Sequence, residues 1–314
     1  MNRNTKISKE LRSVEALIKR DFSKENTISG LYKYIFKSNG KKIRAKLCLT
    51  TSSRTKNKEK IKLASVIELL HTATLIHDDV VDESPTRRGI RSVNNVWTNA
   101  HGVLIGDYIY SKAFIYLVDI GNKKILKELA STTNDIAQGE LVQLDAINNV
   151  NITLNKLKKI SYFKTGRLFE AAAKTGAIIA NENKAFNYNV SECAKNLGIL
   201  FQIIDDLLDY SDSKKIGKPV FQDIKEGKVT YPFFYAYKNA NTREKKRLKD
   251  LLGVSRDLNS KDLELIKSLE GIKKTKQLAE KYHIKAIEYA KKIKNLDIRK
   301  EMIELADTAL NRDK

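Results

Sequence analysis

Two long apolar segments, residues 61–82 and 190–209, each end in the acidic pattern DDxxD. In both segments apolar residues face almost all round a helix, which is typical of helices buried in a core. The chain contains only three prolines, and none lies between residues 86 and 218, so nothing in that stretch forbids long helices. Both apolar segments are therefore predicted to be central helices.

The rest of the chain is also predicted to be helical. Helical patterns cover residues 103–120, 124–145 and 156–180, and amphipathic lysine-rich helices are expected from residue 242 onward. Residues 86–99 and 210–228 are expected to be polar connections. The sequence shows no Pro/Gly/Ser-rich linker and no convincing strand–turn–strand signal. The prediction is an all-α fold with a single domain over residues 1–314.

The chain carries a formal net charge of +21, which raises the question of its partners. A basic face can bind nucleic acid, but no basic run here is interleaved with aromatic residues and no nucleic-acid motif occurs. We therefore favour lysine-rich solvated surfaces and predict no nucleic-acid partner. Peripheral contact with an anionic membrane is the intermediate interpretation.

The location of the protein is predicted from what the sequence lacks. No apolar stretch reaches the roughly 18–20 residues of a membrane-spanning helix. The charged N-terminal residues lack the apolar core of a signal peptide. The two cysteines, Cys48 and Cys193, suggest no disulfide framework. The expectation is a cytoplasmic protein, peripheral to a membrane at most.

The two acidic motifs predict a metal site. They consist of Asp78, Asp79 and Asp82, and of Asp205, Asp206 and Asp209. On a helix the first and last carboxylates of each motif share one face, where like charges cost roughly 0.2–0.5 kcal/mol per pair unless cations compensate them. Carboxylates together with substrate phosphates are the ligands that Mg²⁺ prefers. Two such motifs facing each other would hold a diphosphate through magnesium ions.

Basic residues follow each acidic motif in the sequence. Arginine binds phosphate oxygens with a bidentate fork, and lysine acts as a point charge, so both suit a diphosphate. The candidates are Arg87 and Arg88 after the first motif, Lys218 and Lys228 after the second, and Lys41 and Arg44 in NGKKIRAKL.

With these residues in view, the chain resembles the trans-isoprenyl diphosphate synthases, also called polyprenyl synthetases. The matching pieces are NGKKIR, ELLHTATLIHDDVVDESPTRRG, KTG, FQIIDDLLD and GKPVFQDIKEGKVTYP, in the family's order over roughly residues 30–235. The resemblance implies an isoprenoid-synthase-like helical bundle around a central cavity, usually a homodimer. It also implies a magnesium-dependent prenyltransferase that condenses isopentenyl diphosphate with an allylic diphosphate into an all-trans polyprenyl diphosphate.

The resemblance also assigns roles to individual residues. Asp78, Asp82 and Asp205 match the principal magnesium ligands, and Asp79, Asp206 and Asp209 support them. The residues matched to isopentenyl diphosphate are Lys41, Arg44, His71 and Arg88. Those around the allylic diphosphate are Arg87, Lys164, Thr165, Gln202, Lys218 and Lys228, of which Lys164, Thr165 and Gln202 are also the catalytic candidates. The first basic motif departs from the family pattern at Asn39 and Ala45, which puts the rigidity of its loop in question.

Three further residues near the motifs are assigned more ordinary roles. A lone histidine on an apolar helix is usually a core residue, so His77 is interpreted as one, with a supporting role beside Asp78 as the alternative. Asp135 and Glu140 are candidate site carboxylates, but a solvated or capping role is favoured for both.

Product length is predicted from the residues before the first motif. Ala73 and Thr74 are small where short-chain members of the family tend to carry an aromatic ring. We therefore expect a long product, heptaprenyl to decaprenyl, of the kind used as a quinone side chain. The alternative is a farnesyl or geranylgeranyl diphosphate synthase, in which a bulky residue such as Leu141, Leu144 or Leu168 closes the tunnel sooner.

Two other classes of protein are less consistent with the motifs. A terpene cyclase usually lacks the second DDxxD and the Lys41/Arg44 motif. A non-catalytic subunit or basic binding protein is disfavoured because all six aspartates and both arginines are present.

Overall fold

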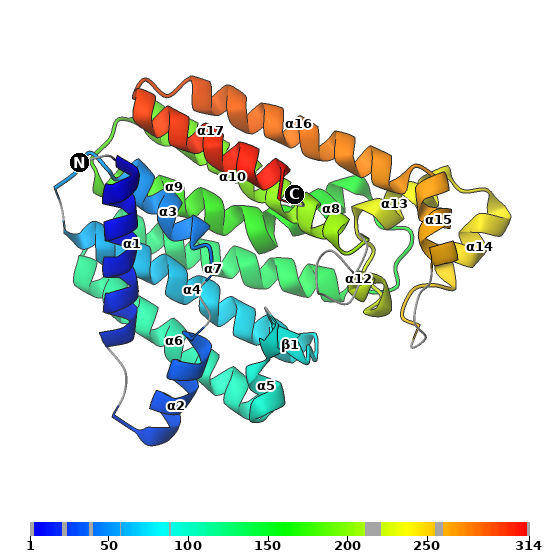
Figure 1. The fold of residues 1–314 in the computed structure, drawn as a ribbon, viewed down its shortest axis with the longest axis horizontal. Coiled ribbons are helices and arrows are strands. Elements are labelled where there is room, and N and C mark those ends of the chain that lie inside the picture. Colours follow the sequence, from blue (N-terminus) through cyan, green and yellow to red (C-terminus); the bar gives the residue numbers. More distant parts are fainter. Residues whose placement is uncertain are drawn as a thin grey trace. The chain divides into compact units, whose positions relative to one another are not determined.

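A computed structural model describes residues 3–20, 24–37, 40–56, 58–87, 89–210, 221–254 and 260–312. Three of the residues discussed above, Asn39, Arg88 and Lys218, lie outside these ranges. The described residues are almost entirely helical, which confirms the predicted all-α class (Figure 1). They form two compact units, residues 1–133 with 171–191, and residues 134–170 with 192–314. The single domain over 1–314 stays a prediction.

The first unit contains the N-terminal helices and a short strand pair. Its elements are α1 (Arg3–Arg20), α2 (Asn26–Ile35), α3 (Ile43–Thr51), α4 (Glu59–Val81), β1 (Thr86–Arg87), β2 (Ile90–Arg91), α5 (Val93–Val96) and α6 (Asn99–Ile120). Parts of α7 (Lys123–Leu144), α9 (Arg167–Ile179) and α10 (Lys184–Leu208) also belong to it. The antiparallel pair β1–β2 lies in a segment expected to be a plain connection.

Helix α4 is the core helix of the first unit. Its buried side chains point in every direction round the helix, as the sequence predicted: Leu63, Ala64, Val66, Ile67, Leu69, Leu70 and Ala73 are all fully buried. Helices α1, α3 and α6 pack against it. Near its C-terminal end α4 lies very close to α6. A Cβ added at Gly102 would lie 2.6 Å from Val80 Cγ2, and one added at Gly106 would collide with the His77 ring. The two glycines therefore allow α6 to pack closely against the end of α4 that carries the first aspartate motif.

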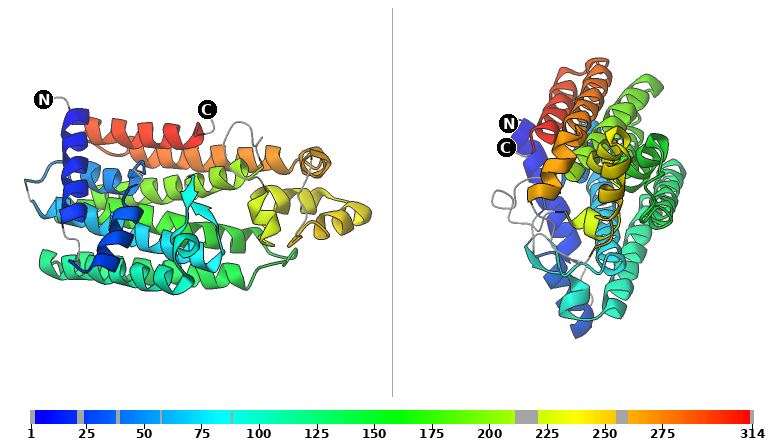
Figure 2. Two further views of the ribbon diagram at one scale, coloured as in Figure 1. Left: turned by 60° about the horizontal axis from the view of Figure 1, so that its bottom comes forward. Right: turned by 90° about the vertical axis from the view of Figure 1, so that its right-hand side faces the viewer.

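The second unit contains the remaining helices. These are α8 (Leu154–Ser161), η1 (Tyr162–Gly166), α12 (Gln222–Lys225), α13 (Tyr231–Asn239), α14 (Thr242–Lys249), α15 (Ser260–Ser268), α16 (Gly271–Lys291) and α17 (Leu296–Leu310), together with parts of α7, α9 and α10. Helices α16 and α17 lie side by side, as Figure 2 also shows. The short helix α12 lies within the predicted loop 210–228, of which residues 211–220 are outside the described ranges.

One predicted helix is interrupted. Residues 156–180 were expected to be continuous, but the chain runs through α8 into one π-helical turn, η1, and only then into α9. Single π turns inside longer helices occur frequently at functional sites. Within the part of the chain that the structure describes, no helix is long and apolar enough to cross a membrane.

Candidate active site

The first aspartate motif lies at the C-terminal end of α4. Asp79 is buried and Arg87 Nε donates a hydrogen bond to its Oδ1 at 2.6 Å. Burial raises the pKa of Asp79 to about 6, against the opposing effect of Arg87. Asp78 and Asp82 are only partly buried. The middle aspartate is thus anchored in the protein, while the outer two lie nearer the solvent.

A tight turn brings Arg87 back to the motif. Ser84 N donates to the Asp79 carbonyl oxygen at 3.0 Å, and Asn94 Nδ2 donates to the same oxygen at 3.2 Å. Glu83 has a left-handed φ of 48°, which reverses the chain after α4. Arg87 then lies in β1, whose pairing with β2 holds its backbone. The structure therefore brings Arg87 to the first motif, as the sequence predicted.

Two of the residues assigned to isopentenyl diphosphate meet in the first unit. Arg44 Nη1 lies 3.0 Å from His71 Nε2, so the guanidinium donates to the ring nitrogen. Lys41 is exposed just before α3. The backbone N–H of Ala45 donates to Glu68 Oε1 at 3.1 Å, a bond that a proline at this position would not make. The departure at Ala45 thus adds a hydrogen bond from the start of α3 to α4.

His77 packs between helices. Its Nε2 lies 3.2 Å from the carbonyl oxygen of Val103 and 3.4 Å from Asp107 Oδ1, both on α6. Its ring also fills the space left by Gly106. The side chain is 34% exposed, so His77 packs against α6 but is not the core residue that was expected.

The second motif lies at the C-terminal end of α10. Thr165 Oγ1 donates to Gln202 Oε1 at 2.6 Å, and Gln202 Nε2 donates to Asp206 Oδ1 at 2.8 Å. Asp206 is buried, and burial raises its pKa to about 7 against the opposing hydrogen bond from Gln202. Three residues predicted for the site therefore form one hydrogen-bonded chain within the second unit.

Asp209 holds the start of α12. Its Oδ1 accepts from Gln222 N at 2.9 Å, and its Oδ2 accepts from Asp223 N at 3.2 Å. Burial raises the pKa of Asp209 to about 6, while these two N–H groups lower it. Lys228, nearly buried, pairs with Glu226 at 2.6 Å just after α12. Asp209 thus positions the short segment that carries Lys228.

Lys164 lies in the π turn η1 and faces two polar side chains of α7. Its Nζ lies 2.7 Å from Glu140 Oε2 and 2.5 Å from Gln143 Oε1. The favoured interpretation of Glu140 as solvated or capping was wrong, because Glu140 pairs with a candidate site residue.

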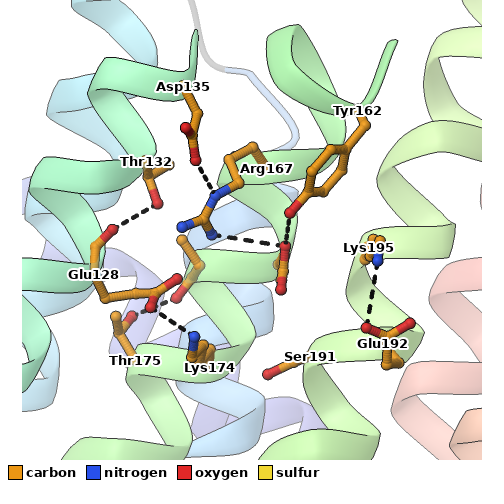
Figure 3. Close-up of polar contacts among 12 residues, drawn as sticks. Glu128, Thr132, Asp135, Tyr162, Arg167, Lys174, Thr175, Ser191, Glu192 and Lys195 are labelled. Carbon is orange, nitrogen blue, oxygen red and sulfur yellow. Dashed lines mark hydrogen bonds and ion pairs between the residues drawn. The ribbon is translucent and has the colours of Figure 1, made fainter. Parts of the chain in front are cut away.

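A polar network beside η1 was missed by the sequence analysis (Figure 3). Tyr162, the first residue of η1, donates from its hydroxyl to Glu170 Oε2 at 2.5 Å. Arg167 lies 3.6 Å from the same carboxylate and donates from Nε to Asp135 Oδ2 at 2.7 Å. Asp135 was also expected to be solvated or capping, and it instead anchors the nearly buried Arg167. The network ties both ends of the π turn to its surroundings.

The residues relevant to product length differ in burial. Ala73 is fully buried, Leu168 is buried, and Leu141 and Leu144 are exposed by 63% and 41%. The central cavity and the tunnel stay predictions.

The chemistry of the donors suits a hard divalent cation. Every candidate ligand is a carboxylate, and oxygen ligands are those that Mg²⁺ and Ca²⁺ prefer. Among the residues that the structure describes, no three His, Cys, Asp or Glu side chains are gathered in a metal-binding arrangement. The fit to a metal therefore rests on donor type and on the repeated pattern of the two motifs.

Comparison with known proteins identifies the family. The polyprenyl synthetase family model matches residues 25–269. Octaprenyl diphosphate synthase of Escherichia coli K12 is 36% identical over 250 residues, which cover 78% of this chain and 77% of that protein. The chain therefore belongs to the polyprenyl synthetase family. It is a trans-polyprenyl diphosphate synthase, and its family uses isopentenyl and allylic diphosphates and depends on divalent metal ions.

Solved structures agree with this assignment and with the isoprenoid-synthase fold. A decaprenyl diphosphate synthase from Rhodobacter capsulatus superposes with a TM-score of 0.92 at 31% identity, covering 99% of this chain and 98% of that chain. A polyprenyl synthase from Caulobacter crescentus CB15, complexed with calcium and isoprenyl diphosphate, gives a TM-score of 0.91 at 32% identity, with 98% and 96% covered.

Proposed function

We propose that this enzyme uses Mg²⁺ held by Asp78, Asp82 and Asp205 to condense isopentenyl diphosphate with an allylic diphosphate. The observation that carries the proposal is the shared construction of the two motifs. In each, the middle aspartate is buried and hydrogen-bonded, Asp79 to Arg87 and Asp206 to Gln202, while its neighbours are only partly buried. Such anchoring leaves Asp78, Asp82 and Asp205, which are partly buried, as the carboxylates that a cation and a substrate phosphate would reach.

The residues of η1 and α10 would stabilise the reacting allylic carbon. When bound, the metal supplies Lewis-acid stabilisation of the charge on the departing diphosphate. The Thr165 hydroxyl donates a hydrogen bond to Gln202 Oε1, so Thr165 Oγ1 and Gln202 Oε1 both keep lone pairs that can face the substrate. Oriented oxygen dipoles of this kind stabilise a developing positive charge. The double bond of isopentenyl diphosphate then attacks, and the proton that is lost goes to the departing diphosphate.

Basic residues would divide the two substrates between them. We assign Lys41, Arg44, His71 and Arg88 to isopentenyl diphosphate, and the contact between Arg44 and His71 supports a shared site for that pair. To the allylic diphosphate we assign Arg87, Lys164, Lys218 and Lys228 together with Thr165 and Gln202. Arg88→Ala should then mainly raise the KM for isopentenyl diphosphate and Arg87→Ala the KM for the allylic partner. Equal effects of both variants on both substrates would refute this division.

We further propose a long product for quinone side chains. The similar proteins from Escherichia coli and Rhodobacter capsulatus are named octaprenyl and decaprenyl diphosphate synthases. The small residues Ala73 and Thr74 agree with an open path for a long chain.

A homodimer is proposed as the functional assembly. Helix α6 exposes Leu104, Ile115 and Val118 by 68%, 57% and 68%, at spacings that place all three on one helix face. Exposed apolar residues gathered on one face suit an interface between subunits. For location, we propose the cytoplasm with peripheral contact to an anionic membrane, in keeping with the net charge of +21.

The metal role is tested by removing one carboxylate from each motif. Asp78→Ala and Asp205→Ala should abolish turnover while the circular dichroism spectrum stays helical, and excess EDTA should abolish turnover of the wild type. Asp250→Ala, at an exposed position at the end of α14, is the matched control and should remain active. Near-wild-type turnover in either motif variant, or in EDTA, would refute the proposal.

A further inference from the structure

Arg312 lies just beyond the end of α17 and contacts the second aspartate motif. Its Nη1 donates to Asp205 Oδ1 at 2.6 Å. Its guanidinium carbon also lies 4.0 Å from the centroid of the Phe201 ring. Phe201 and Asp205 are four residues apart on α10, so both lie on the same helix face. Arg312 is thus held at the motif by a charge contact and a stacking contact together.

The guanidinium of Arg312 can contact the ring and the carboxylate at the same time. An arginine over an aromatic face gains a cation–π attraction, and the planar guanidinium keeps its edge donors available for a carboxylate. Asn311 steadies the approach, because its Nδ2 donates to the Asp307 carbonyl oxygen at 2.9 Å at the end of the helix. The Arg312 side chain is 25% exposed and that of Asp205 is 40% exposed, so solvent and ions can reach the pair.

Helix α17 has extensive contacts besides those of Arg312. The helix buries an apolar face against its surroundings, consisting of Ile298, Met302, Leu305, Ala306 and Ala309. It packs beside α16 along its length. A role for Arg312 in merely holding the helix is therefore a weak explanation of its two contacts.

We propose that Arg312 is a further residue of the active site, which competes with the divalent cation for the Asp205 carboxylate and so sets the metal affinity of the second motif. The inference rests on the proposed metal role of Asp205. The Arg312 guanidinium on Oδ1 and a divalent cation on the same carboxylate would lie close together and repel each other. Binding of the cation therefore weakens the contact with Arg312, and the contact with Arg312 weakens binding of the cation.

The test is the affinity of the full-length protein for Mn²⁺, measured without substrate from the EPR signal of the free ion. Partly exposed ion pairs of this kind contribute an affinity factor of about two to five. Arg312→Gln should therefore lower the Kd for Mn²⁺ by about two- to five-fold. Lys300→Gln removes the same charge from an exposed position on α17 and should leave the Kd unchanged.

Two variants separate local competition from a general charge effect. Arg312→Lys keeps the charge but cannot stack flat on the ring, so its Kd should lie between those of the wild type and Arg312→Gln. Phe201→Leu keeps every charge and removes the stacking surface, and should shift the Kd in the same direction as Arg312→Gln. An unchanged Kd in both of these variants would overturn the specific competition.

Asp205→Asn distinguishes failure of this inference from failure of the proposed metal site. If Asp205→Asn weakens Mn²⁺ binding but Arg312→Gln binds Mn²⁺ no more tightly than the wild type, Arg312 does not compete and the inference is wrong. If Asp205→Asn leaves Mn²⁺ binding unchanged, Asp205 is not a metal ligand and the inference is overturned together with that assignment.

Discussion

Replacing Gly198 by alanine tests whether the close approach of α10 to the π turn supports catalysis. A Cβ at position 198 would lie 2.7 Å from the Gly166 Cα and 2.9 Å from the Phe169 Cβ. Ordinary contacts begin at 3.4 Å, so η1 and α10 must separate by about 0.7 Å. The backbone and a buried ring cannot move aside as a flexible side chain would.

The expected effect on activity exceeds the effect on stability. Overpacking lowers the free energy of unfolding by about 1–3 kcal/mol. The higher helix propensity of alanine raises it by about 1 kcal/mol relative to glycine. The same displacement would stretch the 2.6 Å bond from Thr165 to Gln202, four residues after Gly198, beyond normal hydrogen-bond length. Since a misplacement of about 1 Å can cost a hundred-fold in rate, we expect kcat/KM to fall roughly ten- to hundred-fold.

The assay pairs steady-state kinetics with thermal unfolding. Gly30→Ala is the matched control, because a Cβ at Gly30 in α2 would meet nothing within 4 Å. It should stabilise the protein by about 0.5–1 kcal/mol and leave kcat/KM unchanged. A Gly198→Ala variant with wild-type kcat/KM would refute the argument that this glycine contact positions Thr165 and Gln202.

Three further predictions follow from particular contacts. Tyr162→Phe removes the hydrogen bond from the start of η1 to the Glu170 carboxylate. It should lower the free energy of unfolding, measured by denaturation, by about 1.5–3 kcal/mol and should also lower kcat. Unchanged values of both would contradict the role given to the network. Ala73→Phe should shorten the products seen by thin-layer chromatography, and the same long product in variant and wild type would show that the tunnel does not pass this residue. Burial raises the pKa of the thiols of Cys48 and Cys193, so a thiol reagent at pH 8 should modify them only after unfolding; rapid modification of the native protein would contradict their buried placement.

The sequence predicted the two long helices that are most deeply buried in the core. Helix α4 extends over Glu59–Val81 and α10 over Lys184–Leu208, close to the predicted segments 61–82 and 190–209. These segments are apolar almost all round and end at a charged motif, so their hydrophobic patterns indicate helices buried in the core.

The π turn could not be predicted in the same way. The pattern over residues 156–180 is that of one continuous helix, and a π turn leaves no local signature in it. In the structure, η1 is held by contacts with residues distant in sequence or in the next helix, such as Tyr162 with Glu170 and Gly166 with Gly198. Contacts of this kind exist only once the helices have packed.

The roles of single charged residues were the least predictable. Asp135 pairs with Arg167 across 32 positions and Arg312 with Asp205 across 107. Asp135, Arg167 and Arg312 each look like a solvated charge in their own segment, and the motif around Asp205 does not point to Arg312. A single sequence contains no signal for pairs so far apart, whereas motifs such as DDxxD keep their members within one helical turn.

The size of the product made by the purified enzyme tests the proposed long-chain activity most directly. The protein would be incubated with Mg²⁺, farnesyl diphosphate and labelled isopentenyl diphosphate, and the dephosphorylated products separated by chromatography. The enzyme should make all-trans products from heptaprenyl to decaprenyl, and none when EDTA is added. Farnesyl or geranylgeranyl products only, or products that form in EDTA, would contradict this proposal.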